Sequence, residues 1–92
     1  MASHGWFILN PICQWEGNVE KFIEWLSNKY NVQEWSYNSD FRTLMIEIRR
    51  PPTACTIQRL ANNWFNEDNM GYDTFLVHVL CSVDGETVVH KS

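Results

Sequence analysis

The chain has 92 residues, enough for one domain and too few for two. Hydrophobic residues make up 45% of it, an ordinary share for a globular protein, so residues 1–92 are expected to form a single domain with 1–5 disordered. Seven basic and eleven acidic residues give a net charge of −4, which disfavours generic nucleic-acid binding because such domains neutralise phosphates with a basic excess.

The first predicted element is a central strand in the continuous apolar run 6–9, which ends at Asn10 and Pro11. Asn18 is then predicted to be the N-cap of an amphipathic helix that stops at Asn31. The apolar stripe of this helix consists of Val19, Phe22, Ile23, Leu26 and Tyr30.

Residues 32–37 alternate weakly and predict an edge strand, with Gln33, Trp35 and Tyr37 on one face and Val32 on the other. A polar turn at 38–40 leads into the clearest alternation of the chain, at residues 44–49. The short spacing predicts that these two strands form a hairpin.

Thr53 follows two prolines and is predicted to cap a second helix. The buried stripe predicted for this helix is Ala54, Ile57, Leu60, Ala61 and Trp64. Residues 72–83 form the longest strand candidate, and the Asp84-Gly85 pair predicts a hairpin turn before a short extra strand at 87–90.

This order of elements predicts an α+β domain of the ferredoxin-like β-α-β-β-α-β type. We expect a two-layer sandwich in which an antiparallel sheet carries two helices on one face and an extra C-terminal hairpin strand. The first and third strands would be central, and the other face of the sheet would be open or covered by a partner. Many unrelated functions share this fold, so function has to be inferred from particular side chains.

The cysteines and histidines predict no cofactor, metal site or catalytic group. Cys13, Cys55 and Cys81 form no CxxC pair, and sparse, odd cysteines are typical of reduced cytoplasmic proteins. His78 and Cys81 are three apart on one strand and face opposite sides. We therefore expect a protein that is not an enzyme, located in the cytoplasm, or in the host-cell cytoplasm if it is viral.

Three activities found on this fold need residues that this chain lacks. An acylphosphatase-like anion cradle needs an arginine in the loop after the first strand, and residues 10–16 contain none. A metal nuclease of the CRISPR-adaptation type needs an aspartate where Asn10 stands. An RNA-recognition motif needs paired aromatic residues on the third strand, which are missing from residues 42–48.

Our leading hypothesis is a protein–protein interaction module, because the chain has more large aromatic residues than a small core can hold. Homodimerisation through the open sheet face is one version. A more specific version is a small acidic inhibitor or decoy, similar in size and charge to anti-CRISPR proteins of phages, that docks into a basic groove of a nucleic-acid-handling complex. The residues predicted to bind the partner are Trp25, Trp35, Tyr37, Met45, Glu16, Glu20, Glu24 and Glu34.

Two alternatives stay open. The first is binding of RNA or single-stranded nucleic acid by an anion site of Arg42, Arg49 and Arg50 beside exposed aromatic side chains. The second is a regulatory domain that senses a small molecule at a dimer seam. No membrane partner is expected, since the run 6–9 is far too short to span a bilayer.

Overall fold

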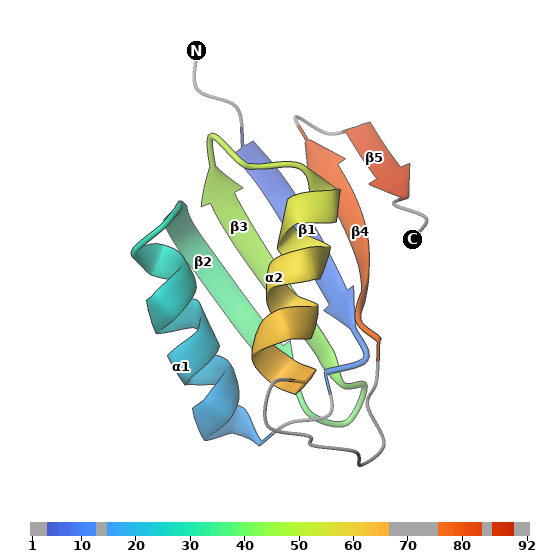
Figure 1. Ribbon diagram of the computed structural model, residues 1–92. Coiled ribbons are helices and arrows are strands. Elements are labelled where there is room, and N and C mark those ends of the chain that lie inside the picture. The colour runs from blue at the N-terminus through green and yellow to red at the C-terminus, as the bar shows by residue number, and fades with distance from the viewer. Residues whose placement is uncertain (1–3, 13–14, 67–75, 84–85, 90–92) are drawn as a thin grey trace.

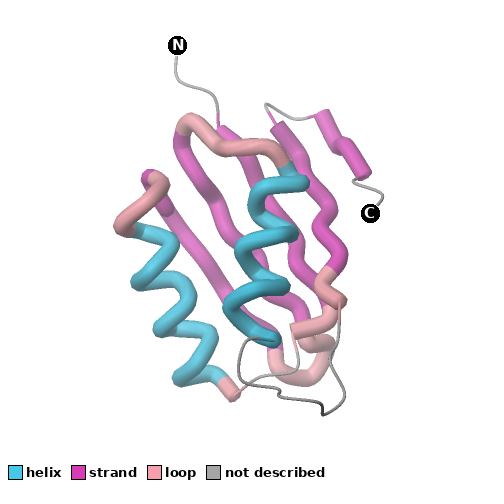
Figure 2. Tube along the Cα trace, viewed as in Figure 1, coloured by secondary structure: helices cyan, strands magenta, loops and turns pink. Residues whose placement is uncertain are grey.

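The computed structural model describes residues 4–12, 15–66, 76–83 and 86–89. It confirms the ferredoxin-like order, with both helices packed on one face of a single sheet (Figures 1 and 2). The elements are β1 (His4–Asn10), α1 (Glu16–Ser27), β2 (Asn31–Asn38), β3 (Thr43–Arg49), α2 (Ala54–Asn66), β4 (His78–Val83) and β5 (Glu86–Val89).

The sheet has the strand order β2-β3-β1-β4-β5, and every neighbouring pair is antiparallel. β1 and β3 are therefore interior strands, as their apolar sequences predicted. β5 pairs with β4 as the expected hairpin strand, while the predicted turn residues 84–85 lie outside the described residues. β2 is an edge strand, also as predicted.

The core lies between the sheet and the helices because alternate strand residues point to the helix side. Phe7, Leu9, Leu44, Ile46 and Ile48 are fully buried from β1 and β3, and Val79 and Cys81 join them from β4. The helices close the core with Val19, Phe22, Ile23 and Leu26 from α1 and with Ile57, Ala61 and Phe65 from α2.

Both ends of α1 differ from the prediction. The helix begins at Glu16, with Trp15 in the N-cap position and no side-chain capping bond, so the prediction of Asn18 as N-cap was wrong. It ends at Ser27, and Asn31 opens β2 instead of stopping the helix. Packing of the apolar stripe sets these limits, because propensity and capping signals are weak beside tertiary contacts.

α2 begins as predicted, since the Thr53 hydroxyl oxygen accepts a hydrogen bond from the Thr56 amide at 3.2 Å. Its buried stripe is rotated slightly from the prediction. Phe65 is buried, whereas Leu60 and Trp64 are half-buried on the flank that faces α1.

β4 begins at His78, six residues later than the predicted strand; residues 72–75 lie outside the described part of the chain. The register pairs His78 with Asn10, so the partner of Val77 would be Pro11, which has no amide hydrogen to donate. The Asn62 side chain bonds both backbone groups of Val77 instead: it accepts from the amide at 2.7 Å and donates to the carbonyl at 3.3 Å.

A shift of register between Val32 and Glu34 corrects the predicted faces of β2. One extra residue in a strand reverses the side-chain alternation beyond it. Val32 is therefore half-buried against the core together with Trp35 and Tyr37, although the sequence placed it on the opposite face.

Candidate partner-binding surfaces

The aromatic residues of β2 face the helix layer. Trp35 and Tyr37 are half-buried against the core, and the Tyr37 hydroxyl donates a hydrogen bond to the Ile12 carbonyl at 2.8 Å. Met45 lies on the opposite, open face of the sheet, where 37% of it is exposed. The structure thus divides the predicted set of Trp35, Tyr37 and Met45 between two surfaces.

A groove runs between α1 and β2 on the helix side, with a volume of about 540 Å³. It brings together three of the residues predicted to bind a partner: Glu20 and Glu24 from α1 and Trp35 from β2. We call this the acidic groove, and its lining consists of Glu20, Ile23, Glu24, Ser27, Asn28 and Trp35.

Negative charge continues along α1 beyond the acidic groove. Glu16, Glu20 and Glu24 are all exposed and recur every four residues, which puts them on one side of the helix. Like charges at this spacing destabilise a helix by roughly 0.2–0.5 kcal/mol per pair. Within the described part of the chain, no ion pair compensates Glu20 or Glu24.

The outer side of β2 borders the acidic groove and is an edge of the sheet. An edge strand presents backbone amides and carbonyls that can pair with another extended chain. The shift between Val32 and Glu34 interrupts this edge near its start, so the regular stretch extends from Glu34 to Asn38.

Glu34, the fourth predicted acidic residue, lies away from the groove. It stands opposite Glu47 in the β2–β3 register, on the open face, and Glu47 in turn lies 3.6 Å from the His4 imidazole. The structure therefore brings Glu16, Glu20 and Glu24 to one side and Glu34 to the other.

Trp25 packs between the helices. Its ring centroid lies 5.2 Å from that of Trp64 and 5.9 Å from that of Phe22, and the Lys29 ammonium lies 4.9 Å from its centroid. This half-buried indole joins α1 to α2. Packing accounts for Trp25 without a partner.

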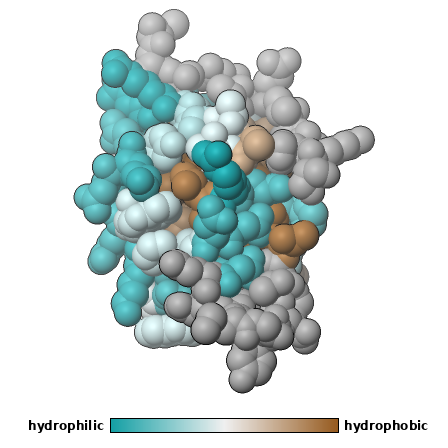
Figure 3. Space-filling view, in the orientation of Figure 1, coloured by the Kyte–Doolittle hydropathy of each residue, from teal (hydrophilic) through white to brown (hydrophobic). Residues whose placement is uncertain are grey.

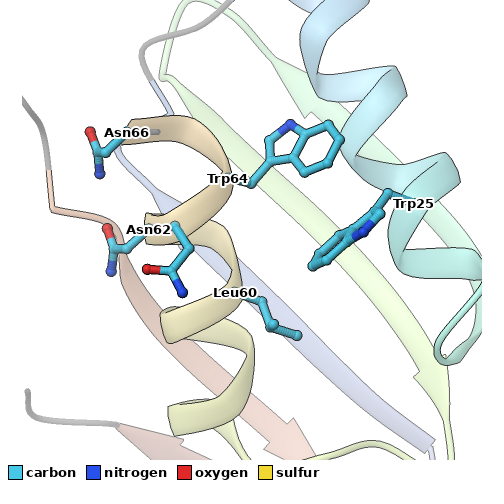
Figure 4. A pocket seen from close by; sticks show the side chains of 6 residues that line it. Trp25, Leu60, Asn62, Trp64 and Asn66 are labelled. Atoms are coloured by element: carbon cyan, nitrogen blue, oxygen red, sulfur yellow. The ribbon is translucent and has the colours of Figure 1, made fainter. Parts of the chain in front are cut away.

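A second hollow, of about 550 Å³, is lined by Trp25, Leu60, Trp64 and three asparagines of α2. Figure 4 shows the two indoles facing each other across the gap between the helices, whereas Asn62 and Asn66 project from the other flank of α2. Ligand sites usually combine apolar walls with convergent polar groups. Here the amides and indoles point apart, and both amide atoms of Asn62 already bond to Val77.

The open sheet face carries an apolar patch that the sequence only hinted at. Ile8 pairs with Met45 on one side and with Leu80 on the other, so these side chains form a row across three adjacent strands. Leu80 is 41% exposed, and Trp6, two residues before Ile8, is half-buried on the same face. The signal in the sequence is the run 6–9, which is apolar on both faces of its strand and also predicts the central position of that strand.

The three predicted anion-binding arginines do not form one site. Arg42 precedes β3, whereas Arg49 ends it and Arg50 follows, so a whole strand separates them. Arg42 and Arg50 both have positive φ angles, of 53° and 56°. The Arg42 carbonyl accepts hydrogen bonds from the Ile12 amide at 2.8 Å and from the Asn10 side chain at 3.2 Å, which gives its backbone a structural role.

The titratable groups show no built reaction centre in the part of the chain that the structure describes. No three His, Cys, Asp or Glu side chains gather there as metal ligands would. Cys81 is buried in the core, and burial raises the pKa of its thiol, which makes it a weaker nucleophile. Cys55 is exposed, and Cys13 lies outside the described residues.

The helix side of the molecule is mostly polar where it is described, with strongly apolar side chains visible in small areas between and beside the helices (Figure 3). Neither of the described helices is long and apolar enough to cross a bilayer. Comparison of the chain with protein-family models, curated proteins and solved structures finds no match.

Proposed function

We propose that this protein is a non-enzymatic interaction module that binds an extended, positively charged segment of a partner protein at the acidic groove. The observation that carries this proposal is the meeting of Glu20, Glu24 and Trp35 in one groove beside the edge strand β2. Carboxylates and an indole face are the groups that recognise an arginine or lysine side chain.

Strand addition to β2 would deliver such a side chain to the groove. An added strand lies about 4.8 Å from its neighbour, and directly opposite residues have Cβ atoms roughly 5 Å apart on the same face. A partner residue opposite Trp35 would therefore lie beside the indole on the helix side, next to the groove that Glu20 and Glu24 line. Backbone hydrogen bonds between the partner segment and β2 would supply affinity. The acidic groove would favour segments that carry a positively charged side chain opposite Trp35.

The carboxylates of α1 favour this use. Glu16 benefits from its place in the first turn of the helix, but Glu20 and Glu24 make no ion pair within the described residues, and like charges four residues apart repel each other. A cationic partner would convert this repulsion into attraction and would speed association at low salt.

Proteins that handle nucleic acid are rich in lysine and arginine where they bind phosphates. An acidic chain that occupies such a segment would block nucleic acid from it. An inhibitor or decoy of a nucleic-acid-handling complex, of the anti-CRISPR kind, is therefore the version of the function that the charge of this surface favours. Nucleic-acid binding by the chain itself is less favoured, because Arg42 lies at the far end of β3 from Arg49.

The test uses a seven-residue peptide of alternating threonine and valine with arginine at the centre, titrated into the isotopically labelled protein and followed by NMR. We expect shifts at the Trp35 indole and along β2. The same peptide with citrulline, which keeps the shape of arginine but not its charge, should bind roughly tenfold more weakly.

Two double variants with the same net charge separate a local effect from a general one. Glu20→Gln with Glu24→Gln should weaken arginine-peptide binding about tenfold, whereas Glu47→Gln with Asp40→Asn, which lie outside the acidic groove and off the edge of β2, should change it little. Equal losses in the two variants, or shifts centred on another surface, would refute the proposed site.

A further inference from the structure

The helix-free face of the sheet carries a second surface, separate from the acidic groove. We propose that it is a self-association surface on which a second copy of this chain stacks. Its centre is the row Met45–Ile8–Leu80, with Trp6 beside it. Met45 and Leu80 are 37% and 41% exposed, and the alternation of the strands turns both away from the core.

The layout of the row suits a second copy. Ile8 is in the middle, and its two neighbours, Met45 and Leu80, are of similar size and polarity. A two-fold axis in the plane of the interface and along β1 would set Ile8 against its own copy and Met45 against Leu80 of the copy. An isologous contact of this kind needs a patch that is complementary to itself, which the row provides.

Charge does not oppose a copy on this face, although two chains of net charge −4 repel each other in general. Glu34 and Glu47 lie on the open face, and Arg49 shares the strand face of Glu47. Among the described residues of β1 to β4, two carboxylates thus stand against one guanidinium on this face, so little like charge is brought together when two copies stack.

The size of the surface sets the expected strength. Strands about 4.8 Å apart and six or seven residues long give a described face of roughly 20 by 20 Å, so two stacked copies would bury about 800 Å² in total, in the range of weak, transient contacts. Sheets that stack face to face lie about 10 Å apart, close enough for the row to interlock with its copy. We therefore expect a weak, reversible dimer.

The experiment is sedimentation equilibrium on the full chain from about 5 to 500 µM, at low and high salt. We expect a reversible dimer that high salt does not weaken, because burial of apolar surface drives it. A mass of one chain at every concentration would overturn the proposal, and so would a dimer that dissociates on addition of salt. This series uses the unmodified protein and does not depend on how any variant folds.

Three variants locate the contact. Met45→Lys and Leu80→Lys each place a charge in the row and should raise the dimer Kd at least tenfold. Trp15→Lys makes the same kind of change at a side chain that is 69% exposed beside α1, and it should leave the Kd unchanged. A dimer that survives both row variants, or is lost only in Trp15→Lys, would place the interface elsewhere. Thermal unfolding of each variant checks that the fold is retained.

Discussion

A substitution at Asn62 tests how the segment before β4 is attached to α2. The Asn62 side chain bonds both backbone groups of Val77, a residue that is 1% exposed and has no strand partner because Pro11 stands opposite it. We predict that Asn62→Asp at neutral pH keeps the bond from the Val77 amide but sets a carboxylate oxygen against the Val77 carbonyl.

The magnitude follows from those two contacts. One hydrogen bond is lost, and a buried carbonyl is left without a donor beside a negative charge, which together cost about 2–3 kcal/mol. For a chain of this length, that corresponds to a fall in Tm of roughly 10–20 °C. The matched control is Asn63→Asp, which puts the same charge on the next, exposed residue of α2 and should cost much less.

Acid should reverse part of the loss, and the sign can be worked out. Once protonated, the carboxyl group introduced by Asn62→Asp regains a donor for the Val77 carbonyl, so its pKa in the folded state lies above the unfolded value of about 3.9. The stability gained from protonation is fully present below the unfolded pKa and is lost as pH rises through the folded pKa. The gap between Asn62→Asp and Asn63→Asp should therefore narrow from pH 7 to about pH 3.5.

Urea unfolding followed by tryptophan fluorescence measures this gap directly. If the two variants differ by less than about 0.5 kcal/mol at pH 7, the bonds to Val77 do not support the fold as described. If the gap is large but unchanged in acid, the cost arises from packing, and the hydrogen-bond reasoning is wrong.

Three further predictions concern single side chains. Tyr37→Phe removes the hydroxyl that bonds the Ile12 carbonyl and should lower the free energy of unfolding by about 1 kcal/mol in urea. Gln58→Met should be neutral or slightly stabilising in the same assay, because the buried Gln58 side-chain oxygen has no partner among the described residues. The Cys55 thiol should react with an alkylating reagent much faster than the Cys81 thiol, which is buried and has a raised pKa. Peptide mapping after a short exposure to the reagent measures the two rates, and equal rates would contradict the burial of Cys81.

The fold was largely predictable, because the spacing of apolar residues along the sequence indicates which segments are helices and which are strands. The strand alternation at 44–49 and the helical stripe at 19–26 each appear in the structure as buried faces. The errors have local physical causes that no pattern encodes. The extra residue in β2 turned Val32 inward, and Pro11, which has no amide hydrogen, stands opposite Val77 just before β4 begins at His78.

The candidate surfaces were harder to predict, because they depend on which side of the sheet each strand residue occupies. The sequence grouped Trp35 with Met45 as exposed residues, but one faces the helices and the other the open side. The sequence did predict Glu20, Glu24 and Trp35 as partner-binding residues, but nothing in it indicated that the three line one groove. Leu80 was not predicted as a surface residue, because the prediction of its strand rests on the buried face, which Val79 and Cys81 occupy.

The two proposed surfaces lie on opposite layers of the molecule, and this has a measurable consequence. Stacking through the open faces covers neither α1 nor the outer edge of β2, so a dimer would present two acidic grooves at once. A partner with two basic segments would then gain affinity from the second contact, typically by a factor of about 100 or more if its linker spans the grooves. Leu80→Lys should therefore leave the binding of the single arginine peptide unchanged and weaken that of a tandem peptide toward the single value. A tandem peptide that binds no better than the single one to the dimer, at any linker length, would mean that the two grooves do not act together.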